Sequence, residues 1–208
     1  FSSSKKDFKG EVNFKPFYLS TDLNFNYINK KKIFQSESLL LDLIDSELLN
    51  NPNLNASINI TIDKIDKFEY LQNFFSKIHL GDGKILIKNF NTQWNDSVSI
   101  KSNEIEFLND IDGKKLIGEI IFNFDDIEKF FRYFQIKRNY RNVFDEIRLD
   151  FVYDLTLDKL IMNNVKIDDK SFKKTEKFLN EYNKIKNNSF NKVTIKNFIK
   201  DFFQIYAG

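Results

Sequence analysis

The sequence predicts an α+β protein: a curved antiparallel β-sheet of about eight strands, forming an open groove or a partial barrel, with about five amphipathic helices packed against it. Three observations lead to this fold class. Segments of alternating apolar and polar residues recur along the chain, other segments carry apolar residues at helical spacing, and the connections between the expected strands are short. Short connections favour antiparallel neighbours, so we expect a sheet built mainly from hairpins.

The first third of the chain predicts three strands and a helix. A strand around Val12 lies at a sheet edge or ends near Pro16, because proline has no N–H group to donate to a neighbouring strand. Residues 23–27 alternate as a second strand. Residues 39–48 carry a helical stripe, and residues 54–62 alternate without interruption as a third strand.

The middle of the chain predicts a helix and then a hairpin. Residues 66–78 fit an amphipathic helix that begins at Asp66, and Gly81-Asp82-Gly83 predicts a turn after it. Residues 85–94 and 98–107 predict two strands joined by a tight turn at Asn95-Asp96. The apolar stripe of the expected helix consists of Phe68, Leu71, Phe74, Phe75 and Ile78.

The remaining chain is organised around residues 116–167. Residues 116–124 predict a strand, and Asp125-Asp126 predicts the N-cap of a helix that ends near Arg138. Residues 147–155 predict another strand, after which the chain turns and returns through residue 167. The tail, 170–208, predicts two amphipathic helical segments. We expect residues 1–208 to form a single domain.

Composition excludes several classes of protein. The chain has 208 residues and a net charge of +2, and its basic residues are interleaved with acidic ones, which argues against a nucleic-acid partner. It has no cysteine, so disulfides and thiolate metal sites are excluded. The chain contains no run of about 18 apolar residues, so the sequence predicts no membrane-spanning helix. Because the chain begins at Phe1, we expect an anchor or export signal to precede it.

The sequence predicts no catalytic residue, metal site or cofactor. His79 is the only histidine and adjoins a turn, where a surface or partly packed role is expected. Asp125-Asp126 and Asp168-Asp169 lie at the ends of predicted elements, where helix caps and turns account for them. One basic and aromatic cluster lies at a helix end, where cations complement the helix dipole; the alternative is a site for a phosphate or a lipid headgroup. The cluster comprises Arg132, Tyr133, Lys137, Arg138, Tyr140 and Arg141.

The chain is unusually rich in phenylalanine, with 24 residues, and its predicted strands carry one apolar face. There are two alternatives: these side chains fill a core between sheet and helices, or part of a strand face lines an open groove for an apolar ligand. Both require the same alternation of apolar and polar residues, so the periodicity does not distinguish them. The candidate groove-lining residues are those that alternate along the predicted strands: Ile58, Ile60, Ile85, Ile87, Ile120, Phe122, Leu149, Phe151 and Tyr153.

Several stretches resemble the C-terminal region of AsmA-like envelope proteins, which are related to bridge-like lipid transporters. The resembling stretches are residues 12–18, 83–94, 134–141, 150–153 and 197–208. The resemblance implies the C-terminal part of a longer protein that is anchored in the inner membrane by an upstream segment and exposed to the periplasm. It also implies phospholipid as the ligand and envelope proteins as candidate partners.

The expected function is therefore a non-catalytic envelope module. Its apolar β-groove would shield lipid acyl chains and contribute to glycerophospholipid transport between the inner and outer membranes. The alternative is a structural or assembly factor for outer-membrane protein biogenesis that binds no lipid. An enzyme is the third class, and it would require activity that depends on a carboxylate such as Asp125 or Asp126.

Overall fold

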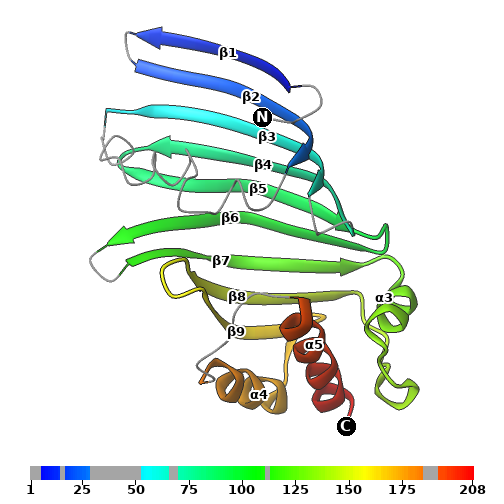
Figure 1. Ribbon diagram of the computed structural model, residues 1–208. Helices are drawn as coiled ribbons and strands as arrows, with labels where there is room; N and C mark the ends of the chain where they lie inside the picture. The colour runs from blue at the N-terminus through cyan, green and yellow to red at the C-terminus, as the bar shows by residue number, and fades with distance from the viewer. Residues whose placement is uncertain (1–5, 15–16, 29–52, 66–69, 111–112, 185–191) are drawn as a thin grey trace. The chain divides into compact units, whose positions relative to one another are not determined.

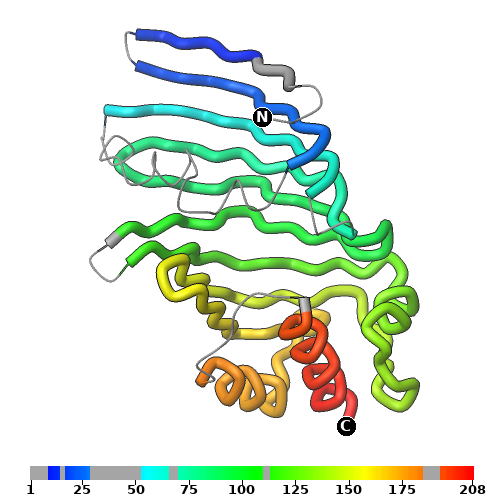
Figure 2. Tube along the Cα trace, viewed as in Figure 1, coloured from blue at the N-terminus to red at the C-terminus, as the bar shows by residue number. Residues whose placement is uncertain are grey.

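The computed structural model describes residues 6–14, 17–28, 53–65, 70–110, 113–184 and 192–208. Within these ranges it has ten strands in one mixed sheet, whose order follows the chain, and three α-helices (Figures 1 and 2). The prediction of about eight strands and about five helices is thus wrong. The strands are β1 (Lys6–Phe14), β2 (Phe17–Ile28), β3 (Asn55–Ile65), β4 (Leu71–Gly81), β5 (Lys84–Trp94), β6 (Val98–Asp110), β7 (Gly113–Phe124), β8 (Glu146–Asp154), β9 (Lys159–Ile167) and β10 (Lys170–Ser171). The helices are α3 (Ile127–Phe134), α4 (Lys173–Asn183) and α5 (Lys192–Ala207), with a short 3-10 helix, η2 (Arg138–Tyr140).

The sheet is mixed because β2 and β3 run parallel, with Tyr18 opposite Asn55 and Ile28 opposite Ile65. This overturns the prediction of an antiparallel sheet. A parallel pair requires a crossover of a dozen or more residues, and the segment between β2 and β3 is long enough to supply one. The helix expected at residues 39–48 lies outside the described residues.

The predicted helix at residues 66–78 is also wrong over its described part, because Leu71 to Ile78 belong to strand β4. The spacing of Phe74 and Ile78 satisfies a helical period, but it satisfies strand alternation equally well. Pairing decides between the two: β4 forms antiparallel ladders with β3 on one side and β5 on the other. The ladder hydrogen bonds of two neighbours replace those of a local helix.

The predicted turns are confirmed where the structure describes them. Asp82 and Gly83 join β4 to β5 with φ angles of 53° and 70°. Asn95 and Asp96, between β5 and β6, each have a φ of 52°. Two successive residues with positive φ are what a type I′ hairpin requires, and Asn, Asp and Gly adopt this conformation at the lowest cost.

The chain divides into two compact units. The first comprises residues 1–95 and 101–107, and the second residues 96–100 and 108–208. In the first unit, buried Ala56 and Leu80 form a small core against the partly buried side chains of Leu19, Ile78 and Ile85. The predicted single domain, as the C-terminal part of a longer protein, stays a prediction.

The second unit has a core rich in phenylalanine. Helix α3 begins as predicted, with Asp126 as the N-cap that accepts a hydrogen bond from the backbone N–H of Lys129 at 3.0 Å. The predicted helices of the tail are confirmed as α4 and α5, which lie side by side, with α4 next to β9 (Figure 1). The ring of Phe203 on α5 packs against Phe131 and Phe144, at centroid distances of 5.4 and 5.6 Å.

Candidate functional site

In the first unit, the candidate lining residues lie on one face of three neighbouring strands. Ile58 of β3 lies opposite Ile78 of β4, which lies opposite Ile87 of β5. The three isoleucines form a cross-strand row, and all are only partly buried. Ile60 is opposite Ser76, and Ile85 is opposite Leu80. The structure therefore brings Ile58, Ile60, Ile85 and Ile87 together on one face.

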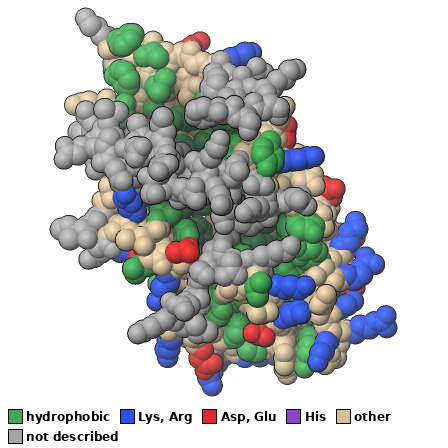
Figure 3. All heavy atoms as spheres, viewed as in Figure 1, with side chains coloured by type: hydrophobic (Ala, Val, Ile, Leu, Met, Phe, Trp, Pro, Cys, Tyr) green, Lys and Arg blue, Asp and Glu red, His purple; other side chains and the backbone are tan. Residues whose placement is uncertain are grey.

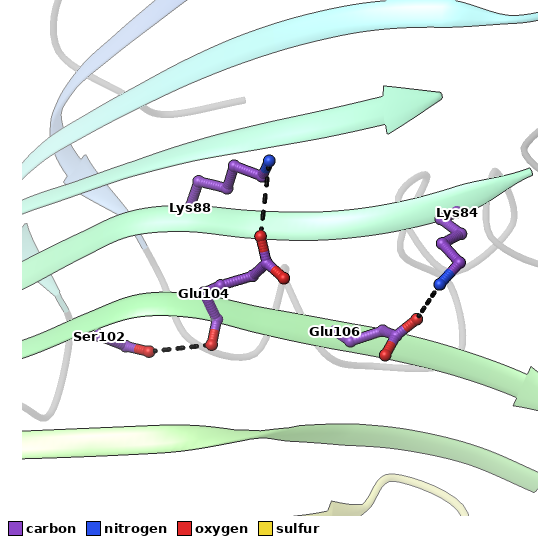
Figure 4. A network of polar contacts seen from close by, with 5 residues as sticks. All are labelled: Lys84, Lys88, Ser102, Glu104 and Glu106. Carbon is purple, nitrogen blue, oxygen red and sulfur yellow. Dashed lines mark hydrogen bonds and ion pairs between the residues drawn. The ribbon is translucent and has the colours of Figure 1, made fainter. Parts of the chain in front are cut away.

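The opposite face of the same strands is mixed, with charged and amide side chains beside the apolar Leu86 and Phe75. Lys84 and Lys88 of β5 point toward Glu106 and Glu104 of β6, with nitrogen–oxygen distances of 3.2 and 3.5 Å (Figure 4). On β3, the side-chain amide of Asn59 donates a hydrogen bond to the carboxylate of Asp22 on β2 at 2.7 Å. This part of the sheet therefore has one face that carries the isoleucines and an opposite face that carries the paired charged and amide groups.

In the second unit, the other candidate residues share a face of β7 and β8. Ile120 lies opposite Leu149, and Phe122 lies opposite Ile147, in a ladder without a register shift. Phe151 and Tyr153 follow Leu149 at alternate positions, so they lie on the same face as Leu149. These two strands thus bring Ile120, Phe122, Leu149, Phe151 and Tyr153 together.

Packing closes one end of this second apolar face. The ring of Phe124, at the end of β7, contacts those of Phe130 and Phe144 at centroid distances of 5.1 Å each. Ile147 and Ile167, which lie opposite each other on β8 and β9, are buried at this end, whereas the five candidate residues are partly buried. Figure 3 shows hydrophobic side chains reaching the surface in several patches on the face in view. Phenylalanine-rich packing thus accounts for one end of the face and leaves the candidates partly accessible.

Tyr153 differs from the other candidates because its hydroxyl has a defined partner. The hydroxyl donates a hydrogen bond to Asp158 Oδ1 at 2.6 Å. Burial, this hydrogen bond and the charge of Asp158 all raise the pKa of Tyr153, since each favours the neutral phenol. The ring belongs to the apolar face, while the hydroxyl fixes the turn between β8 and β9.

Of the residues considered for chemistry, His79 belongs to a strand and Asp168 orders the backbone at the start of another. His79 lies partly buried in β4, opposite Ser57 and Leu86. Asp168 accepts hydrogen bonds from the backbone N–H groups of Asp145 and Glu146, each at 3.0 Å, and so orders the start of β8. In the part of the chain that the structure describes, no three metal-ligating side chains gather in one place.

In the basic and aromatic cluster, which begins in the last turn of α3, Arg141 bonds to other residues of the fold. The guanidinium of Arg141 donates to the carboxylate of Glu128 and to the carbonyl oxygen of Ile136, at 3.0 Å in both cases. It also lies 5.9 Å from the ring centroid of Phe131. Arg141 therefore ties the segment after α3 back onto that helix. Arg132, Lys137 and Arg138 are exposed.

Sequence reasoning missed Ile78, which lies at the centre of the isoleucine row. The helical spacing of Phe74, Phe75 and Ile78 places it in a predicted helix. The signal that could have identified it is the alternation of Phe74, Ile78 and Leu80 directly before the Asp82-Gly83 turn, which is typical of a hairpin.

In comparisons with known proteins, no family model matches this chain, and no curated protein or solved structure matches it at a significant level. Among the described residues, no helix is both long and apolar enough to cross a membrane.

Proposed function

We propose that this chain is a non-catalytic module of the cell envelope that shields the acyl chains of phospholipids on the apolar face of its β-sheet. In this role it contributes to glycerophospholipid transport between the inner and outer membranes. The resemblance to AsmA-like proteins suggests a periplasmic location and an inner-membrane anchor supplied by an upstream segment.

The observation that carries the proposal is the partly buried row formed by Ile58, Ile78 and Ile87. Branched apolar side chains in register on adjacent strands make a continuous apolar strip, and strands lie about 4.8 Å apart. An acyl chain lying across such a strip loses its contact with water, and the free energy of binding becomes more favourable by about 0.8 kcal/mol per buried methylene group. The charged pairs Lys84–Glu106 and Lys88–Glu104 lie on the other face, so they need not be desolvated.

The second unit supports the same role through Leu149 and Phe151, which are partly buried beyond the end closed by Phe144. A face of aromatic and aliphatic side chains suits flexible hydrocarbon, because burial of apolar area is non-directional. Lipid headgroups would stay in water.

The test is native mass spectrometry with lipid extraction on the 208-residue chain expressed in a Gram-negative periplasm. Ile60→Asp places a charge on the apolar face, and Thr61→Asp places the same charge on the opposite face of the same strand. We expect phospholipid bound to the unmodified chain and to Thr61→Asp, and little bound to Ile60→Asp, while all three keep a cooperative thermal transition.

Three outcomes would contradict the proposal. A lipid-free chain with a cooperative transition would mean that the apolar faces are closed cores. Unfolding of both Ile60→Asp and Phe151→Asp would lead to the same conclusion, because a charge in a dry core is not tolerated. An envelope protein that co-purifies in the absence of lipid would favour the assembly-factor alternative.

A further inference from the structure

Residues 126–141, which run from the N-cap of α3 to the end of the basic and aromatic cluster, carry five basic and two acidic side chains. Asp126 forms an ion pair with Lys129 at 3.2 Å, and Glu128 forms one with Arg141 at 3.0 Å. The charge of Arg132 also acts on Asp126 and lowers the pKa of that carboxyl. In the part of the chain that the structure describes, three exposed cations of the cluster have no ion pair: Arg132, Lys137 and Arg138.

The end of α3 does not require all of these cations. Its C-cap, Gln135, has a φ of 56°, and the backbone N–H groups at and after this residue donate to the carbonyl oxygens of Arg132 and Phe131. These are the bonds of a Schellman motif, which ends a helix through its own backbone. The helix dipole acts over the last turn, so it accounts for Arg132 better than for Lys137 and Arg138, which lie beyond the helix.

The acidic side chains around α3 do not offset this charge. Asp125 precedes the helix, and Asp145 bonds through its backbone to the end of β7, so both belong to the N-terminal end of α3. On α5, Lys200 donates to Gln135 Oε1 at 3.5 Å and is followed by exposed Asp201, so these two residues add no net charge. Positive charge is therefore concentrated at the C-terminal end of α3.

An exposed apolar side chain follows the cations. Val143 is 78% exposed and lies two residues after Arg141. The next residue, Phe144, is buried, and its ring lies 6.4 Å from that of Phe131 on α3, so packing holds this segment beside the helix. Free phosphate and nucleic-acid backbones offer no apolar contact to Val143. A membrane interface accepts both kinds of side chain, since cations contact lipid phosphates and apolar groups reach the acyl boundary.

We propose that Arg132, Lys137 and Arg138 bind the phosphate groups of an anionic phospholipid bilayer, with Val143 entering the interface beside them. The partner is a membrane surface that contains anionic lipid. The two arginines suit this partner because a guanidinium group can donate to two phosphate oxygens at once. Binding here involves headgroups in a bilayer and not acyl chains on the apolar face of the sheet, so it goes beyond the proposed function.

The test is co-sedimentation of the 208-residue chain with vesicles of phosphatidylcholine, alone or mixed with phosphatidylglycerol. We expect binding only to the mixed vesicles, and weaker binding as salt is added, because salt screens exposed charges. The variant R132Q/K137Q/R138Q should bind about a hundredfold more weakly, since each basic side chain near an anionic surface contributes about fivefold. Val143→Ser should weaken binding about fivefold, because the interface loses an apolar side chain.

K173Q/K174Q/K184Q is the matched control. It removes three exposed lysines at the two ends of α4, in the same unit, and changes the net charge of the chain by the same amount. It should bind the mixed vesicles as the unmodified chain does. Circular dichroism and thermal melts would establish that both triple variants are folded, as expected for substitutions at exposed positions.

Failure of this inference is distinguishable from failure of the proposed function. Ile60→Asp should lose extracted phospholipid and still sediment with the mixed vesicles, whereas R132Q/K137Q/R138Q should show the reverse. A chain that carries no extracted lipid but sediments with the mixed vesicles would support this inference and contradict the proposed function. A chain that carries lipid but does not sediment would overturn this inference alone.

Three further outcomes would overturn the inference. Equal weakening in both triple variants would mean that net charge, and not this cluster, governs binding. Tighter binding to single-stranded DNA than to the vesicles, lost in R132Q/K137Q/R138Q, would assign the cluster to a nucleic acid. Thermal stabilisation by inorganic phosphate without vesicle binding would assign it to free phosphate.

Discussion

The side chain of Asn183 on α4 bonds to both backbone groups of Met162 on β9. Its Nδ2 donates to the Met162 carbonyl oxygen at 2.8 Å, and its Oδ1 accepts from the Met162 N–H at 3.1 Å. One amide thus mimics the ladder partner that an outer strand otherwise lacks. It fastens α4 to the sheet and closes that part of the edge to other strands.

Replacement of Asn183 by Ala is expected to lower the free energy of unfolding by about 1–3 kcal/mol, because two backbone groups at buried Met162 lose their partner. Asn180→Ala, at an exposed position on the same helix, should change it by less than about 0.5 kcal/mol. Urea denaturation of both variants measures the difference. Equal stability of the two would show that the amide bonds are dispensable.

Phe203→Ala is expected to destabilise the second unit by about 3–5 kcal/mol, since the residue is only 2% exposed and lies among several other rings. The lost stability is the sum of two free energies: that of transferring the ring from water into the core, and the cost of the cavity that remains. Gln204→Ala, at the next and exposed position of α5, is the control. A change in the midpoint of denaturation below that expected for 1 kcal/mol would mean that this core is loosely packed.

Asp126 should make the stability of α3 depend on acidity. The backbone N–H of Lys129 donates to its carboxylate and, with the side chain and charge of Lys129, holds the pKa of Asp126 below its ordinary value of 3.8. A lowered pKa stabilises the folded state above pH 3.8, and this contribution is lost as the pH falls through the folded-state pKa.

Asp126→Asn isolates the effect of the charge, because asparagine also caps helices well. The unmodified chain should be the more stable of the two at neutral pH, and the difference should shrink below pH 3.8. Denaturation curves at several pH values would show this. A difference that stays constant across the acidic range would rule out the ionised carboxylate as its source.

Tyr153→Phe removes the hydroxyl that donates to Asp158 while keeping the ring on the apolar face. We expect a loss of about 1 kcal/mol near neutral pH, since a hydrogen bond to a charged but solvent-accessible partner is of that order. Because the pKa of Tyr153 is raised, its contribution is complete below the unfolded value of 10.0 and declines as the pH rises through the folded value.

The measurement compares the two chains by urea denaturation near neutral pH and above pH 10.0. Lipid binding should be retained in Tyr153→Phe, since the proposed ligand contact is made by the ring. Loss of bound phospholipid together with unchanged stability would assign the hydroxyl to the ligand and not to the turn.

Much of the local structure was predictable from the sequence. The strands β3 and β5 to β9, the turns at Asp82-Gly83 and Asn95-Asp96, and the N-cap of α3 are each encoded by residues close together in sequence. Alternation shows which residues share a face, so the grouping of Leu149, Phe151 and Tyr153 was predictable too. These are properties of single elements and their immediate flanks.

The tertiary structure decided what depends on distant partners. Residues 71–78 suit a helix or a strand, and pairing with β3 and β5 makes them a strand. The parallel direction of β2 against β3 is a property of their pairing, which no local pattern specifies. The sequence by itself determined the periodicity, the turns and the caps, because these follow from neighbouring residues. Only the tertiary structure decided strand partners, direction and which phenylalanines are buried, because hydrogen bonding and burial of apolar area depend on residues far apart in the chain.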